Sequence, residues 1–159
     1  MAFYKVTKKL GFSDAIPVFE NGEFKNPSLF SHEYGATGGT PTIVDDCIVF
    51  GNYTVVGNSG IRFDINSSDK YTLIINFEST ATAYAQVGVC NKNADAASCL
   101  NTGAGRLAYT GDTLSTEGII VTGTIGNTSP NSTSIYIAGN SLKIKSIYCV
   151  FGTPFITGR

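Results

Sequence analysis

The sequence contains few of the residues on which catalytic and nucleic-acid-binding sites depend. Only 14% of its 159 residues are charged, the formal net charge is −1, and there is a single histidine. Proteins that bind nucleic acid need a concentrated basic surface, which this balance of charge does not supply. The same balance argues against docking to anionic lipid. We therefore expect no nucleic-acid partner and no membrane partner.

Long apolar runs are absent as well. No stretch approaches the roughly 20 consecutive apolar residues that a membrane-spanning helix needs. The leading residues 1–9 carry three lysines, but no apolar segment follows them. A Sec signal peptide has such a segment directly behind its basic residues. We therefore expect neither a membrane span nor a secretory leader.

The four cysteines do not form a metal-binding pattern. Their spacing fits no zinc motif, and a lone histidine cannot complete one. Cys47 and Cys149 lie inside apolar runs, so we expect them to be small core residues. Cys90 and Cys99 flank a polar loop, and either a loop-closing disulfide or two free thiols is compatible with that position.

Oxygen ligands gather at only one place in the sequence. Asp64, Asn66 and Asp69 surround a strand-to-turn junction, and Ca²⁺ prefers oxygen ligands in such loops. The spacing departs from that of an EF-hand loop, however, and the closing glutamate is missing. Asn and Asp side chains also form turns through hydrogen bonds to their own backbone. We expect turn chemistry here, with no metal and no cofactor.

The sequence also lacks a recognisable catalytic set. His32 lies in an irregular segment, without the rigid scaffold that a nucleophile and its base require. Asp45 and Asp46 are adjacent, so on a strand they would point to opposite faces and could not both flank one glycosidic bond. Glu78 and Glu117 lie near strand ends, but nothing in the sequence links them. We therefore expect a protein that is not an enzyme.

What the sequence has in abundance is alternating β-type runs separated by Gly, Asn, Ser and Thr clusters. Successive side chains on a strand point to opposite faces, so each such run has one face for a core and one for solvent. Many short strands at this spacing predict an all-β fold, an antiparallel two-sheet β-sandwich of jelly-roll type. The expected strands are Thr42–Phe50, Tyr53–Val56, Ile61–Ile65, Tyr71–Phe77, Thr80–Cys90, Arg106–Tyr109, Gly118–Ile125, Ser134–Ala138 and Leu142–Phe151, with a hairpin at Gly139-Asn140.

Residues 1–39 differ from the rest because they show no sustained period. Asn21-Gly22 lies between two short apolar-bearing arms, and this dipeptide favours the two-residue type I′ turn of a β-hairpin. Gly38 and Gly39 end the segment and indicate a hinge. We therefore divide the chain into an extended N-terminal arm with a small hairpin, residues 1–39, and a β-sandwich body, residues 40–159.

The aromatic residues of the arm need a surface to pack on, since a two-stranded hairpin is marginal alone. We expect a partner chain to supply that surface, because aromatic side chains are frequent anchors at interfaces. The expected anchor residues are Phe3, Tyr4, Phe12, Phe19, Phe24 and Phe30.

A second candidate surface lies on the body. Alternation places Tyr84 and Gln86 together on the more polar face of one strand, and Tyr136 opposite two isoleucines on another. A tyrosine on a polar face offers a flat apolar surface with a polar tip, which suits stacking on a sugar or packing at a protein interface. These three residues form the candidate ligand or interface face, unless a loop or the arm covers them.

The body resembles the carbohydrate-binding modules of jelly-roll type. In those modules a strand such as Ile61–Ile65 leads through a polar turn, here Ser67-Ser68-Asp69, into a strand that begins with tyrosine, here Tyr71–Phe77. Leu142–Phe151 occupies the place of their last core strand. The resemblance covers residues 40–151 and implies a sugar-binding function, although the usual binding-face tryptophan is missing.

The composition as a whole also resembles that of bacteriophage virion proteins such as head fibres, decoration proteins and tail appendages. In those proteins an N-terminal arm docks on the particle and a β-sandwich projects outward. This resemblance implies a structural protein made in the bacterial cytoplasm and assembled into a virion, with other virion proteins and its own copies as partners. Homotrimers are common among such appendages. We take this as the first functional expectation, and a carbohydrate-binding module or adhesin at the cell surface as the alternative. A small hydrolase is a third.

Overall fold

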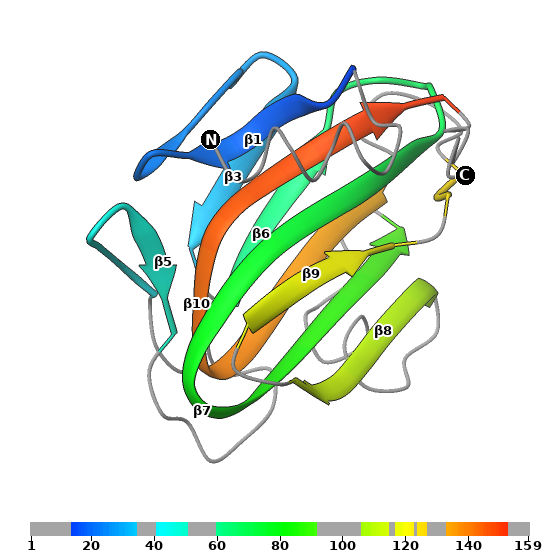
Figure 1. Ribbon diagram of the computed structural model, residues 1–159. Coiled ribbons are helices and arrows are strands. Elements are labelled where there is room, and N and C mark those ends of the chain that lie inside the picture. The colour runs from blue at the N-terminus through cyan, green and yellow to red at the C-terminus, as the bar shows by residue number, and fades with distance from the viewer. Residues whose placement is uncertain are drawn as a thin grey trace, which may run out of the picture.

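The computed structural model describes residues 14–34, 41–50, 60–91, 106–114, 117–122, 124–126 and 133–152. Throughout these ranges the regular structure is β-strand, as the sequence predicts (Figure 1). The strands are β1 (Ile16–Glu20), β2 (Glu23–Phe24), β3 (Phe30–Tyr34), β4 (Thr42–Val44), β5 (Cys47–Val49), β6 (Gly60–Ile65), β7 (Tyr71–Asn91), β8 (Arg106–Leu114), β9 (Glu117–Val121) and β10 (Thr133–Phe151).

Two long strands, β7 and β10, organise the whole fold. They pair antiparallel from Thr133↔Asn91 at one end to Phe151↔Tyr71 at the other. The register shifts between Asn140 and Leu142, and in Figure 1 both strands curve strongly through this region. Each long strand therefore contributes one half to each of two sheets, because an irregularity in the ladder lets a strand bend from one sheet into the next.

The two sheets share these central strands and differ in what flanks them. The first, which we call the β6 sheet, has the order β3-β6-β10-β7-β8. The second, the β1 sheet, has the order β2-β1-β10-β7-β9. The short β4–β5 hairpin extends the β10 edge at Lys143 and Ile144. The expectation of an all-β, antiparallel two-sheet sandwich is confirmed.

The core lies between the sheets and follows from strict alternation. On β6, Ile61, Phe63 and Ile65 are buried in the main cluster, while Arg62 and Asp64 between them face outward. Strand β7 continues the pattern with core residues at every second position from Tyr71 to Phe77. Burying an aliphatic or aromatic side chain of this size stabilises a fold by about 1.5–3 kcal/mol.

Residues 16–34 belong to this core, which differs from the expected separate arm. Strand β1 pairs with β10, and β3 pairs with β6. Val18, Phe19 and Phe30 are each no more than 1% exposed and pack in the main cluster. The expected boundary at residue 39 therefore does not separate residues 16–34 from the body. A register shift between Pro17 and Phe19 explains why the sequence shows no period here, since it puts two successive residues inside.

Two tight turns of the described chain contact each other. Asn21 and Gly22 both have positive φ and join β1 to β2, so the predicted type I′ hairpin is confirmed. Asp45 and Asp46 also have positive φ and join β4 to β5, which corrects the expected continuous strand over residues 42–50. A Cβ placed on Gly22 would lie 2.9 Å from Oδ1 of Asp46, so the tips of the two hairpins are in contact.

The structure also corrects the hairpin that was predicted at Gly139-Asn140. Both residues lie inside β10, paired with Ala85 and Tyr84 of β7. Likewise the expected strands 71–77 and 80–90 are one strand. Pairing with a long neighbour satisfies the backbone donors and acceptors of these polar positions, and this outweighs their local preference for a turn. Elsewhere β9 ends at Val121, earlier than expected, and the expected strand over residues 53–56 lies outside the described residues.

Candidate functional site

The outer face of the β6 sheet carries a cluster of polar side chains at its centre. It consists of Arg62 and Asp64 on β6 and Ser134 and Tyr136 on β10, and we call it the Arg62 cluster. The register Ser134↔Asp64 and Tyr136↔Arg62 places the four residues as two directly opposed pairs. Their neighbours in sequence, Ile135 among them, are in the core, so alternation requires that these four side chains point away from it.

A buried hydroxyl holds the cluster together. Ser134 donates from Oγ to Oδ1 of Asp64 at 2.7 Å, and Nη2 of Arg62 donates to the same Oγ at 3.3 Å. Nε of Arg62 also lies 3.7 Å from Oδ1 of Asp64. Ser134 is 0% exposed. A buried hydroxyl needs partners, because leaving a buried polar group unpaired costs about 1–3 kcal/mol, and here Ser134 has one on each side.

Tyr136 completes the cluster on its apolar side. The guanidinium carbon of Arg62 lies 5.6 Å from the centre of the Tyr136 ring, within the range at which a cation is attracted to an aromatic face. On the other side, the register partner of Tyr136 is Gly88 of β7, which is buried. An aromatic ring next to a glycine in a sheet covers the backbone that the glycine leaves bare.

The accessible part of the cluster is its charged part. The side chains of Arg62 and Asp64 are 25% and 14% exposed, whereas Tyr136 is only 7% exposed. Their opposite charges compensate each other along the same face of β6. The face therefore presents carboxylate oxygens, which accept hydrogen bonds, next to guanidinium N–H groups, which donate them.

The structure corrects the expectation that Tyr136 is a surface aromatic residue. Its ring is buried beside Arg62 and serves as the floor of the cluster. Tyr84 and Gln86 lie on β7 opposite Asn140 and Ala138, four and two residues along from the pair Gly88↔Tyr136. The backbone thus brings the three expected positions into one sheet. The side chains of Tyr84 and Gln86 are outside the described residues, so their role stays a prediction.

The expected anchor residues fall into two groups. Phe19 and Phe30 are buried in the protein's own core, and Phe24 packs against that core and stacks on His32 with ring centres 3.8 Å apart. The physical reason is that β1 and β3 have strand partners within the chain, so these three side chains do not need an external surface. Phe3, Tyr4 and Phe12 lie outside the described residues.

Two of the catalytic candidates, Glu78 and Glu117, are register partners on β7 and β9, and the other candidates make local contacts. His32 joins the edges of the two sheets through its stack on Phe24, and partial burial lowers the pKa of its imidazole below the usual value. Glu78 lies 2.5 Å from Nζ of Lys145 and 3.9 Å from Nζ of Lys143. A hydrogen bond from Lys145 and the charge of both lysines hold the pKa of Glu78 below its usual range. Asp45 and Asp46 form the β4–β5 turn.

The residues around Asp64 make one long-range contact and one turn contact. Asn66 donates from its side chain to the carbonyl of Ser28, and the backbone N–H of Asp69 donates to the hydroxyl of Ser67. Among the residues whose positions are given, no three His, Cys, Asp or Glu side chains gather in a way that could hold a metal ion. The same residues include no helix that is long and apolar enough to span a bilayer.

The predictions for the four cysteines can be compared with the structure at Cys47 and Cys149. Cys47 and Cys149 are free thiols, Cys149 buried and Cys47 half-buried. Burial raises the pKa of the Cys149 thiol to about 12. Cys90 is the next-to-last residue of β7, but its side chain and all of Cys99 are outside the described residues, so the choice between a disulfide and two thiols stays open.

Sequence reasoning missed Arg62 and Ser134 as site residues and considered Asp64 only as a turn or calcium candidate. Alternation alone places Arg62 and Asp64 on the outer face of their strand. What it cannot supply is the pairing with β10, about 70 positions away in the sequence, which brings Ser134 between them. Without that pairing the two charged side chains look like ordinary solvent-facing residues.

The comparisons with known proteins agree with this architecture. No model of a protein family matches the chain, and no curated protein matches its sequence. Among solved structures, one described as "CBM4 structure and function" superimposes with a TM-score of 0.52 at 13% identity, over 80% of this chain and 97% of that chain. The chain has a β-sandwich fold like that of CBM4. At this identity the similarity shows the fold and nothing more specific.

A second match is to a larger protein. It is the Clostridium thermocellum endo-1,4-β-D-xylanase 10B, in a structure of its CBM22-1 and GH10 modules complexed with xylohexaose. The identity is 8%, the TM-score is 0.47, and the match covers 82% of this chain but 27% of that one.

The comparisons give no support to the expectation of a virion protein. The virion expectation also depended on an arm that cannot bury its own aromatic residues, and Phe19 and Phe30 do not fit that premise. We do not carry this expectation forward.

Proposed function

We propose that this protein is a non-catalytic carbohydrate-binding module, which holds a glycan against the outer face of the β6 sheet at the Arg62 cluster. The observation that supports it most is the correspondence with the CBM4 structure, which spans 97% of that chain. The correspondence therefore concerns a whole sandwich and is not confined to a few shared strands. The similarity supports the fold. The cluster is a place on that fold whose side chains can form hydrogen bonds with a sugar.

The chemistry of the cluster suits sugar hydroxyls. Each hydroxyl of a pyranose can both donate and accept a hydrogen bond. Asp64 offers acceptors and Arg62 offers donors in a fixed planar fork. Because the two charges compensate each other at 3.7 Å, the pair is suited to an uncharged glycan. Hydrogen bonds that involve a charged group contribute about 1.5–3 kcal/mol each.

The cluster is also preorganised. Ser134 fixes the orientation of Asp64, and Arg62 is held by Ser134 on one side and by the ring of Tyr136 on the other. A binding site whose side chains are already held in place loses less conformational entropy when the ligand arrives. Along β7, Gln86 and Tyr84 lie opposite Ala138 and Asn140, toward the bend of the sheet.

Affinity gel electrophoresis against a panel of soluble neutral polysaccharides tests the proposal. We expect at least one polysaccharide to retard the protein. Arg62→Gln and Asp64→Asn should each weaken that retardation by about 10-fold or more, since 1.4 kcal/mol corresponds to a factor of ten. Asp64→Asn keeps the size of the side chain and an oxygen that can accept from Ser134, so the fold should be retained.

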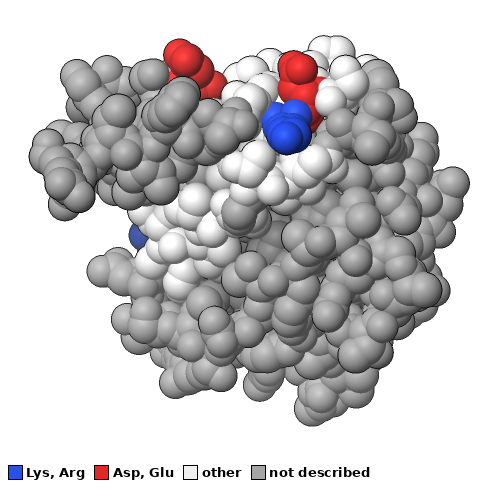
Figure 2. Space-filling model, turned by 90° about the vertical axis from the view of Figure 1, so that its right-hand side faces the viewer, with Lys and Arg blue, Asp and Glu red and all other residues white. Residues whose placement is uncertain are grey.

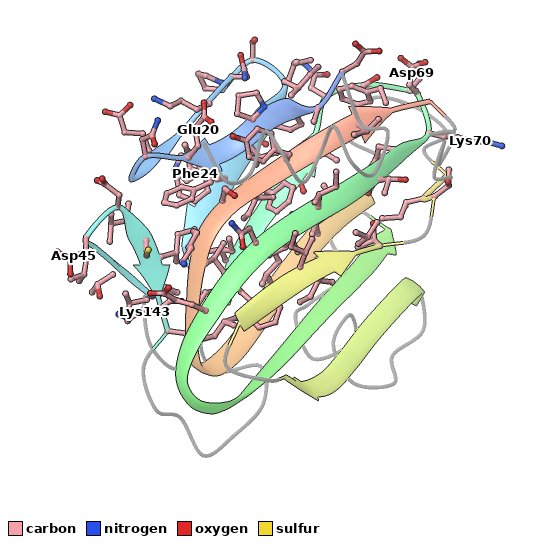
Figure 3. All side chains as sticks on the ribbon, viewed as in Figure 1. Glu20, Phe24, Asp45, Asp69, Lys70 and Lys143 are labelled. Carbon is pink, nitrogen blue, oxygen red and sulfur yellow. The ribbon has the colours of Figure 1, made fainter. Side chains whose placement is uncertain are left out.

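Two variants that make the same charge changes elsewhere provide the controls. Lys143→Gln matches Arg62→Gln, and Asp69→Asn matches Asp64→Asn. Figure 3 shows Lys143 beside the β4–β5 hairpin and Asp69 at the opposite end of the sandwich. Both should bind like the unchanged protein. Folded protein that no polysaccharide in the panel retards, or equal losses in the site variants and the controls, would contradict the proposal.

A further inference from the structure

The side chains of the Arg62 cluster become more exposed from β10 toward β3. On β10, Ser134 and Tyr136 are 0% and 7% exposed. On β6, the side chains of Asp64 and Arg62 are 14% and 25% exposed. Strand β3 lies beyond β6, and among the described strands it pairs with β6 alone. The charged groups of the cluster are therefore open to a ligand on the β3 side and closed on the β10 side.

Ser31 of β3 stands directly opposite Asp64. The register Ser31↔Asp64 puts it on the other side of Asp64 from Ser134. Directly opposed residues of antiparallel strands share a face, and their Cβ atoms lie about 4.5–5.5 Å apart. The preceding residue, Phe30, is in the core, so alternation places Ser31 on the outer face. In contrast to the buried Ser134, Ser31 is exposed.

Asp64 has a carboxylate oxygen that its neighbours on the sheet do not use. The hydrogen bond from Ser134 and the ion pair with Arg62 both involve Oδ1. Within the described part of the chain, neither Oδ2 of Asp64 nor the hydroxyl of Ser31 forms a hydrogen bond. An ionised carboxylate accepts hydrogen bonds, whereas a hydroxyl both donates and accepts them. Together the two groups can satisfy one hydroxyl of a ligand, which donates to Asp64 and accepts from Ser31.

The backbone next to Ser31 is held in place against the end of β6. Asn66 donates from its backbone N–H to the carbonyl of Leu29 at 2.7 Å, and from its side chain to the carbonyl of Ser28 at 3.1 Å. These bonds join the residue after Asp64 and Ile65 to the chain that leads into β3. The separation of Ser31 from Asp64 is therefore set before a ligand arrives, which lowers the entropic cost of binding.

We propose that Ser31 is a specificity-determining residue of the glycan site, and that its hydroxyl and Oδ2 of Asp64 bind the same hydroxyl group of the sugar. This assignment rests on the proposed function, because it concerns the same site. It also orients the ligand, which lies over β6 and β3 and not over β10. A methyl ether in place of that hydroxyl has no proton to donate to Asp64, so the site selects a sugar with a free hydroxyl there.

Affinity gel electrophoresis of Ser31 variants tests the assignment, with the polysaccharide that most strongly retards the unchanged protein. We expect Ser31→Ala to weaken the retardation by about 2- to 10-fold, the factor that corresponds to one neutral hydrogen bond. Ser31→Thr keeps the hydroxyl and should keep most of the affinity. Because Ser31 is exposed, Ser31→Ala should unfold at the same urea concentration as the unchanged protein.

Thr42→Ala is the control for the loss of an exposed hydroxyl. Thr42 lies on β4, in the hairpin that pairs with β10 at Lys143 and Ile144 and so away from the Arg62 cluster. We expect this variant to be retarded like the unchanged protein. A loss equal to that of Ser31→Ala would mean that any exposed hydroxyl has the same effect, and the assignment would be wrong.

A double-mutant cycle tests whether the two residues bind one sugar hydroxyl. If they do, the loss of affinity in the variant that combines Ser31→Ala with Asp64→Asn is smaller than the product of the two single losses. Losses that multiply exactly would show two independent contacts and would contradict the shared hydroxyl.

The measurements separate this assignment from the proposed function. If no polysaccharide retards the unchanged protein, both fail together. If a polysaccharide retards it, and Arg62→Gln weakens the retardation while Ser31→Ala does not, the glycan site stands and the assignment of Ser31 is overturned. An equal loss in Ser31→Thr and Ser31→Ala would also overturn it, since the hydroxyl would then contribute nothing.

Discussion

Arg62 lies over the ring of Tyr136, with its guanidinium carbon 5.6 Å from the ring centre. The two residues are directly opposed on β6 and β10, so sheet register brings them together. Ser134 and Asp64 form the register pair two residues further along the same strands. They contact the guanidinium group on the side away from the tyrosine ring. The cluster is therefore a property of the pairing of β6 with β10, and its parts can be tested one at a time.

Ser134→Ala should destabilise the protein by about 1–3 kcal/mol. The hydroxyl is fully buried and links Arg62 to Asp64, so its loss leaves two charged groups short of a partner. Urea unfolding followed by circular dichroism measures the change. Ser31→Ala, on the exposed part of β3 opposite Asp64, should stay within about 0.5 kcal/mol of the unchanged protein. Equal effects of the two changes would mean that the Ser134 hydroxyl contributes nothing.

Gly22→Ala should destabilise more than Gly152→Ala. Both glycines have positive φ, but a Cβ at Gly22 would approach Asp46 to 2.9 Å at Oδ1 and 3.3 Å at Cα, whereas a Cβ at Gly152 meets nothing within 4 Å. Each change therefore incurs the cost of a positive φ for alanine, about 1–2 kcal/mol, and only Gly22→Ala also pushes the two hairpins apart. The difference between the two unfolding free energies measures the contact of the turns.

Asp46→Gly tests the same contact between the two turns from the other side. It removes the Oδ1 atom that the new methyl group would meet, and it also relieves the positive φ at position 46. In a double-mutant cycle, Gly22→Ala should cost less in the Asp46→Gly background than in the unchanged protein. Strict additivity would show that the two turns do not interact.

Stability should fall as the pH is lowered through the titration of His32. Burial lowers the pKa of His32 in the folded protein, so the unfolded chain binds the proton at a higher pH than the folded one. Stability rises with pH wherever the unfolded state holds more protons. The contribution is therefore complete above the ordinary histidine pKa of about 6.5 and decreases below it. Thermal unfolding between about pH 5 and pH 8 measures this.

His32→Phe is the matched control for the pH series. It keeps a flat ring in contact with Phe24 and removes the titrating group. The melting temperature of this variant should change less between pH 8 and pH 5 than that of the unchanged protein. Because His32 is the only histidine, an unaltered pH dependence would assign the effect to the carboxylates.

Cys149 should be unreactive in the folded protein, and Cys47 should react faster. Burial raises the pKa of the Cys149 thiol to about 12, and it raises the pKa of the half-buried Cys47 less, with the charge of Glu78 acting in the same direction. The thiolate is the reactive form. Iodoacetamide labelling followed by peptide mass spectrometry should modify Cys47 under native conditions and Cys149 only in denaturant. Equal labelling of both in the folded protein would place Cys149 at the surface.

The alternation of apolar residues was sufficient to predict part of the fold. Strands around Ile61–Ile65 and Tyr71–Phe77 follow directly from it, because each has one face in the core. Strand β1 did not show the pattern, since the register shift after Pro17 buries both Val18 and Phe19. Asn140 indicated a turn locally, but its pairing with Tyr84 is a contact between distant residues, which no local pattern reports.

The candidate site was less accessible to sequence reasoning than the fold. Tyr136 was correctly assigned to the face opposite its neighbouring isoleucines, but a residue on a polar face is exposed only if nothing covers it, and here it is buried. Phe19 and Phe30 were expected to need a partner because no strand partner for β1 and β3 could be seen in the sequence. The structure supplies both partners within the chain. On the face that Figure 2 shows, most of the charged side chains of the described residues lie toward the top.

The most direct test of the central claim is a titration of ¹⁵N-labelled protein with neutral hexasaccharides such as cellohexaose, laminarihexaose and xylohexaose, followed by amide chemical shifts. The account predicts saturable shifts at Arg62, Asp64, Ser134 and Tyr136 on the outer face of the β6 sheet, and their loss in Asp64→Asn. Saturable shifts confined to the β1 sheet would contradict it, and so would spectra that no hexasaccharide changes.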